Sequence, residues 1–143
     1  MKPLLAFLFF MLLLPKSFGQ VKGPDITGVW LNDKENAHIE IYQKEDAFFG
    51  KIIWMKQPDT SERETETTQN TMGDSKRSEE LLGMDIISNL VFDGGMWKKG
   101  TLYLPKKDRE VNCEAQLSDD KDVLTLNITK GWFSTRIKWT RIP

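Results

Sequence analysis

Apolar and polar residues alternate along most of the chain in short runs that are separated by turn-forming residues. This period of two puts apolar side chains on one face of a strand and polar ones on the other. In residues 37–42, Ile39 and Ile41 share one face, while His38, Glu40 and Tyr42 share the opposite face. The pattern predicts eight strands, over residues 27–31, 37–42, 48–55, 84–92, 97–104, 111–117, 123–129 and 132–141.

Short turns join most of these predicted strands. The residues Asp93-Gly94-Gly95 tolerate the positive φ of a hairpin turn, and Pro105 ends the next strand because it has no backbone N–H to donate. Gly50 indicates a bulge or bend within the third strand. Since hairpins link consecutive strands, an all-β, antiparallel up-and-down meander barrel of about eight strands is favoured over a sandwich.

One segment interrupts this pattern. Residues 56–80 are rich in Thr, Ser, Glu, Gln and Asn and contain almost nothing to bury, which predicts one long polar loop. Residues 79–82 are expected to form one helical turn that Gly83 ends.

The first residues are typical of a targeting signal. Lys2 precedes the apolar run Leu4–Leu14, which is shorter than the about 20 residues of a transmembrane helix, and Ser17-Phe18-Gly19 is a small-residue cleavage site. We therefore expect a signal peptide at 1–19, a single barrel domain at 20–143, and a secreted or periplasmic protein.

Charge and cysteine content narrow the range of partners. Residues 20–143 hold 18 basic and 21 acidic residues, a net charge of −3, which argues against nucleic acid as a partner.

Cys113 is the only cysteine, so there is no intrachain disulfide and no cysteine beside the cleavage site to carry a lipid anchor. Its alternation with apolar neighbours predicts a buried residue, and the alternative is a reactive thiol.

Catalytic and metal-binding chemistry finds little support. His38 is the sole histidine, without a second histidine or a cysteine to form a metal site or a nucleophile–base pair. Glu62, Glu64 and Glu66 lie in the polar segment, where nothing desolvates a carboxyl group and raises its pKa. We expect a non-enzymatic protein with no cofactor and no catalytic residue.

The two ends of the barrel are predicted from the strand count. With eight strands the last lies beside the first, so Arg141 is expected to cover the Trp30 indole and close one end. The Gly28-Val29-Trp30 motif also resembles the Gly-x-Trp of lipocalins, in which the tryptophan plugs the barrel.

The opposite, open end then collects the turns that carry Lys106, Lys107, Arg109 and Lys130. A ligand is predicted to enter there, with an anionic or polar head toward these cations and its apolar part near Trp54, Trp97 or Tyr103. The alternative is that the cations only keep the turns solvated.

Six motifs, taken in order, resemble the family called domain of unknown function 2147: Ile26-Thr27-Gly28-Val29-Trp30, Ile39-Glu40-Ile41-Tyr42, Gly50-Lys51-Ile52-Ile53-Trp54, Leu81-Leu82-Gly83-Met84-Asp85-Ile86, residues 97–105 and Trp139-Thr140-Arg141. The resemblance implies a small secreted or periplasmic bacterial protein with a lipocalin-like barrel and no established activity. It also makes Arg77 a site residue, because Asn70 and Arg77 match polar positions of the family.

Two functions from different classes follow. The first is an envelope barrel that binds a small, partly apolar ligand, and the second is an interaction module that works through its surface and has a packed interior. A hydrolase is a third alternative without a nucleophile–base set to support it. The oligomeric state is not predicted.

Overall fold

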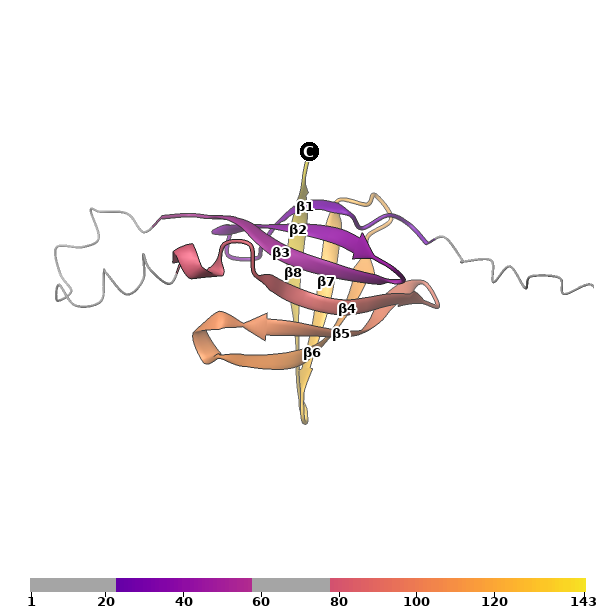
Figure 1. Ribbon diagram of the computed structural model, residues 1–143. Coiled ribbons are helices and arrows are strands. Elements are labelled where there is room, and N and C mark those ends of the chain that lie inside the picture. Colours follow the sequence, from indigo (N-terminus) through magenta and orange to yellow (C-terminus); the bar gives the residue numbers. More distant parts are fainter. Residues whose placement is uncertain (1–22, 58–77) are drawn as a thin grey trace, which may run out of the picture.

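The computed structural model describes residues 23–57 and 78–143 and has a closed β-barrel as its architecture. Its strands are β1 (Gly28–Leu31), β2 (Ala37–Lys44), β3 (Ala47–Met55), β4 (Asp85–Asp93), β5 (Met96–Leu104), β6 (Arg109–Leu117), β7 (Val123–Lys130) and β8 (Phe133–Ile142). Each strand pairs antiparallel with the next, and β8 pairs with β1, so no sheet edge is left open (Figure 1). The predicted eight-stranded meander barrel is therefore confirmed.

The predicted strand bounds agree with the observed ones to within two residues. The turn predicted after Pro105 is a 3-10 helix, η2 (Pro105–Lys107), which Asp108 ends in the left-handed region at φ 46°. The helical turn before β4 is also present, and Gly83 follows it at φ 82°. Most of the predicted polar loop lies outside the described residues, as do residues 1–22, which include the predicted signal peptide.

Glycines allow the strands to bend where the barrel curves most. The β3–β4 register shifts on both sides of Gly50, as predicted, and a Cβ there would lie 3.1 Å from Ile39 Cγ2 and 3.3 Å from Ile87 Cβ. At Gly100 a Cβ would lie 2.4 Å from Leu90 Cδ2. Both positions bring neighbouring chains closer than a larger residue would allow.

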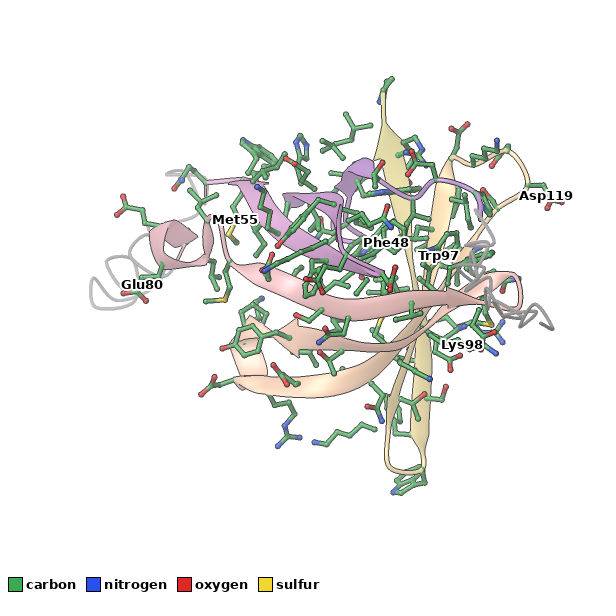
Figure 2. All side chains as sticks on the ribbon, turned by 45° about the vertical axis from the view of Figure 1, so that its right-hand side comes forward. Phe48, Met55, Glu80, Trp97, Lys98 and Asp119 are labelled. Atoms are coloured by element: carbon green, nitrogen blue, oxygen red, sulfur yellow. The ribbon has the colours of Figure 1, made fainter. Side chains whose placement is uncertain are left out.

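Large aromatic side chains pack together in the closed half of the barrel. Trp97 is 1% exposed, and its ring meets Phe92 at 5.0 Å and Phe48 at 6.3 Å between centroids. Figure 2 shows Phe48 and Trp97 well apart from Met55, which belongs to the other half. These rings belong to one hydrophobic core cluster that continues into the other half through residues such as Ile39, Leu102 and Trp139, and the burial of its apolar area stabilises the domain.

Trp30 and Arg141 lie next to each other at the closed end of the barrel. They are cross-strand partners of β1 and β8, and the Arg141 guanidinium lies 4.3 Å from the centre of the buried Trp30 ring. The Trp30 indole N–H donates to the Ile26 carbonyl at 3.0 Å, and Arg141 donates to the carbonyls of Asp25, Thr27 and Lys121 at 2.8–3.0 Å. One guanidinium thus holds together the segment before β1, the β6–β7 turn and the last strand.

Cys113 is buried on β6, as expected, and burial raises the pKa of its thiol to about 12. The folded state therefore disfavours the thiolate, so the unfolded state loses this proton first as the pH rises. The thiol's contribution to stability is fully present below its ordinary pKa of 9.0 and is lost between that value and about 12.

We expect the free energy of unfolding to fall more steeply above pH 9.0 in the natural protein than in the variant Cys113→Ala. Urea denaturation at a series of pH values measures this difference, and the thiol should react with a disulfide reagent only after unfolding. Equal slopes for the two proteins, or rapid reaction of the folded one, would contradict the inferred burial. The Tyr42 pKa, raised to about 12 chiefly by its hydrogen bond to Asp85, affects both proteins equally.

Candidate ligand cavity

The half of the barrel opposite Trp30 contains a cavity of about 560 Å³. Its walls are inward apolar side chains from seven of the strands, β2 to β8: Ala37, Ile39, Ile52, Met55, Ile86, Leu102, Val111, Ile128, Ile137 and Trp139. Small-molecule pockets in proteins measure roughly 300 to 1,000 Å³, and an eight-stranded barrel has room for one small ligand. The interior therefore has a packed closed half and a hollow open half.

Positively charged residues surround the mouth of this cavity. The charged residues that line it are five cations, Lys34, Lys106, Lys107, Arg109 and Lys130, and one acid, Asp33. The cations come from the β1–β2 turn, η2, the start of β6 and the end of β7. These segments meet at the open end because every second connection of an antiparallel meander lies on the same side of the barrel, and those after β1, β5 and β7 are among them.

Side-chain hydrogen bonds fix the shape of two of these turns. The Asn32 side chain accepts from the backbone N–H groups of Asn36 and Ala37, both at 2.9 Å, and donates to the Asn36 side chain at 2.7 Å. The Tyr103 hydroxyl donates to the Asp108 carboxylate at 2.7 Å, which connects β5 with the end of η2. Side-chain hydrogen bonds thus stabilise the two turns from which Lys34, Lys106 and Lys107 extend.

The predicted site residues fall into three groups. Tyr103, Lys106 and Arg109 line the cavity, together with Lys107 and Lys130. Trp54 and Trp97 do not line it: Trp54 is 42% exposed on the outer surface, and Trp97 lies in the packed half. Arg77 lies outside the described residues.

A β-bulge explains the position of Trp54. The pairing changes from His38 with Trp54 to Ile39 with Ile52, so Ile53 has no partner on β2. This extra residue reverses the alternation, and Trp54 turns outward although Ile52, two residues earlier, points inward. The Trp54 ring then packs against His38, with 4.4 Å between centroids and the two planes tilted by 39°.

The cavity also uses residues that the sequence analysis did not assign to a site. Lys34, Ile137 and Trp139 are examples, and Trp139 is 2% exposed. The alternation of β8 places Ile137 and Trp139 on its inward face, but alternation alone does not separate a packed interior from a hollow one.

The cavity combines apolar walls with charged groups at its mouth. Among the described residues, no group of three or more His, Cys, Asp or Glu side chains could hold a metal ion. The apolar walls can bury a hydrocarbon or ring system, while the lysine and arginine heads at the mouth can form charge-assisted hydrogen bonds with an anion. No helix in the part of the chain that the structure describes is long and apolar enough to cross a membrane.

A closed meander barrel with an apolar cavity at one end is a lipocalin-like architecture. The fold is similar to that of a solved structure described as "Protein HP1028 from the human pathogen Helicobacter pylori belongs to the lipocalin family", with a TM-score of 0.59 and 11% identity over 83% of this chain and 84% of that one. At this level of identity the similarity shows the fold alone.

The chain belongs to the bacterial family described as "Uncharacterized protein conserved in bacteria (DUF2147)", whose model matches residues 28–141. The match extends from the start of β1 to the Arg141 of the closed end, so it covers the whole barrel. A search of curated proteins gave no match.

Proposed function

We propose that the protein is a non-enzymatic barrel that binds a small amphiphile, with the apolar part in the cavity and an anionic head among the cations at the mouth. The observation that carries this proposal is the combination of a 560 Å³ apolar cavity with a mouth of five cations and one acid. A filled interior would instead support the surface interaction module. We place this function in the periplasm or outside the cell, on the basis of the predicted signal at residues 1–19.

The charge of the mouth favours an anionic head over a neutral or cationic one. The positive charge is local to the mouth, because the whole sequence has a formal net charge of −1. The turns of the closed end, residues 44–46, 93–95 and 118–122, carry six acids and two lysines, so they have the opposite net charge. An anion is attracted to the open end and repelled from the closed one.

We expect dodecyl phosphate below its micellar concentration to bind saturably, and dodecyltrimethylammonium, which has the same chain and the opposite charge, to bind at least about tenfold more weakly. Isothermal titration calorimetry measures both affinities. Quenching of tryptophan fluorescence provides a second signal, because Trp139 lines the cavity.

The variant Lys106→Gln/Lys130→Gln should bind dodecyl phosphate about tenfold more weakly, since exposed ion pairs contribute up to about 1 kcal/mol each. The matched control is Lys44→Gln/Lys121→Gln, which removes two exposed lysines from turns at the closed end and should leave the affinity unchanged. If neither amphiphile binds saturably, the interaction module becomes the better explanation. Equal losses in the two variants would show that only overall charge matters.

A further inference from the structure

The turn between β7 and β8 exposes two large aromatic side chains to solvent. Trp132 is 95% exposed and Phe133 is 55% exposed, the two highest values among the large apolar residues of the described chain. Their rings meet edge to face at 6.4 Å between centroids, and Gly131 at φ 59° makes the turn tight. Exposing an indole to this extent forgoes the stabilisation that burial would give, which marks the tip as a contact surface.

The hairpin that carries this tip has charges of one sign only. From Val123 to Pro143 the chain contains Lys130, Arg136, Lys138 and Arg141 and no acidic residue. Arg136 and Lys138 are exposed and do not line the cavity. An aromatic tip flanked by cations is the composition that segments at the interface of an anionic membrane have, with the rings at headgroup depth and the cations on the phosphates.

The tip also lies at the mouth of the cavity. Lys130 and Phe133, on either side of the turn, both line it. Figure 1 shows the β7–β8 hairpin extending beyond the other strands, on the opposite side from the C-terminus. The other exposed large apolar residues, Ile53, Trp54, Leu82 and Met84, lie near the end of β3 or just before β4, where strands also reach the open end.

The shape of the tip favours a bilayer over a folded protein as its partner. A stable protein interface buries about 800 Å² on each side, which a two-residue aromatic tip cannot supply. A bilayer needs only that the side chains insert, and the acidic closed end would keep the barrel upright by repulsion from an anionic surface.

We propose that the β7–β8 hairpin docks the open end of the barrel on a lipid bilayer with anionic headgroups. Trp132 and Phe133 insert at the depth of the headgroups, Lys130 beside them contacts the phosphates, and Arg136 and Lys138, further along β8, add electrostatic attraction to the anionic surface. Docking needs no ligand in the cavity; that an amphiphile then passes from the bilayer into the barrel rests on the proposed function.

Sedimentation with sucrose-loaded vesicles tests the docking directly. The natural protein should bind vesicles of equimolar phosphatidylcholine and phosphatidylglycerol, bind pure phosphatidylcholine much more weakly, and be released by salt. Trp132→Ala should weaken binding by about tenfold or more, and Trp132→Tyr should retain most of it. Arg136→Gln/Lys138→Gln should weaken binding by about fivefold or more, and Lys44→Gln at the closed end should have no effect.

Fluorescence gives an independent measure of insertion. Of the five tryptophans, Trp30, Trp97 and Trp139 are buried, so Trp54→Phe leaves Trp132 as the sole exposed indole. Anionic vesicles should shift its emission to shorter wavelength and protect it from quenching by iodide.

Binding to anionic vesicles that is unchanged in Trp132→Ala, or no binding by the folded natural protein, would overturn the docking proposal. Neither result would affect amphiphile binding in solution, because Trp132, Arg136 and Lys138 do not line the cavity. Conversely, a natural protein that binds neither amphiphile saturably in solution could still bind anionic vesicles through Trp132, so the two proposals fail separately.

Discussion

Replacing Trp30 with alanine is expected to lower the free energy of unfolding by about 3 to 5 kcal/mol, the usual cost of truncating a fully buried aromatic residue. The indole is inaccessible to solvent, donates to the Ile26 carbonyl and supports the guanidinium of Arg141. Its loss would leave a cavity at the closed end, an unpaired carbonyl and an arginine without its aromatic partner. Urea denaturation followed by circular dichroism measures the change.

Arg141→Ala should cost less than Trp30→Ala, and the two losses should not add. The residues touch, and contacting residues show interaction energies of about 0.5 to 3 kcal/mol in double-mutant cycles. Trp30→Phe serves as a milder replacement if Trp30→Ala does not fold, and Arg136→Ala, which removes an exposed arginine from the same strand, should change stability by less than about 0.5 kcal/mol. Strict additivity would mean that the contact between the two ends of the chain contributes nothing.

The closure of the barrel was predictable because it depends only on the number of strands. Each strand has a local signature of alternation, and each turn has Gly, Asn, Asp or Pro where the backbone needs them. Once eight strands are counted, the first and last must be neighbours, which places Arg141 beside Trp30 without any information on side-chain packing. The same count places the turns of Lys106 and Lys130 together at the open end.

The lining of the cavity was harder to predict, because a single extra residue reverses the alternation of a strand. The bulge beside Ile53 turns Trp54 outward, although an unbroken period of two would direct it inward with Ile52. A second irregularity follows Trp97, where the β5–β6 register shifts before Gly100 and Lys99 takes φ 62°. The positions of such bulges depend on the curvature of the whole barrel and not only on the local residues. The sequence around them therefore indicates them weakly.

Whether a cavity exists depends on the total volume of the many side chains that point into the barrel. Inward residues of both halves are apolar, but the closed half has Trp30, Trp97, Phe48 and Phe92, which fill it. The open half has mostly isoleucine, leucine, valine and alanine, with Trp139 as its one indole, so that volume is left over. The alternation of apolar and polar residues along a strand identifies which side chains point inward. The unfilled volume follows only from their three-dimensional arrangement.

The double substitution Ala37→Phe/Leu102→Phe is expected to abolish amphiphile binding, with a loss of more than about a hundredfold, while the barrel stays folded. Ala37 on β2 and Leu102 on β5 are both buried and line the cavity, so the added rings would occupy space that is empty in the natural protein. Filling an existing void avoids the strain of overpacking, and stability should change by less than about 1.5 kcal/mol.

The matched control is His38→Phe, which places a phenyl ring on β2 at the position next to Ala37, on the outer face where the His38 ring contacts Trp54. It should bind dodecyl phosphate as the natural protein does. The filled variant should also still sediment with anionic vesicles, because Trp132 and the hairpin cations are unchanged. If the filled variant folds and binds dodecyl phosphate with full affinity, the amphiphile does not occupy the cavity, and the cations at the mouth must then act on the outer surface.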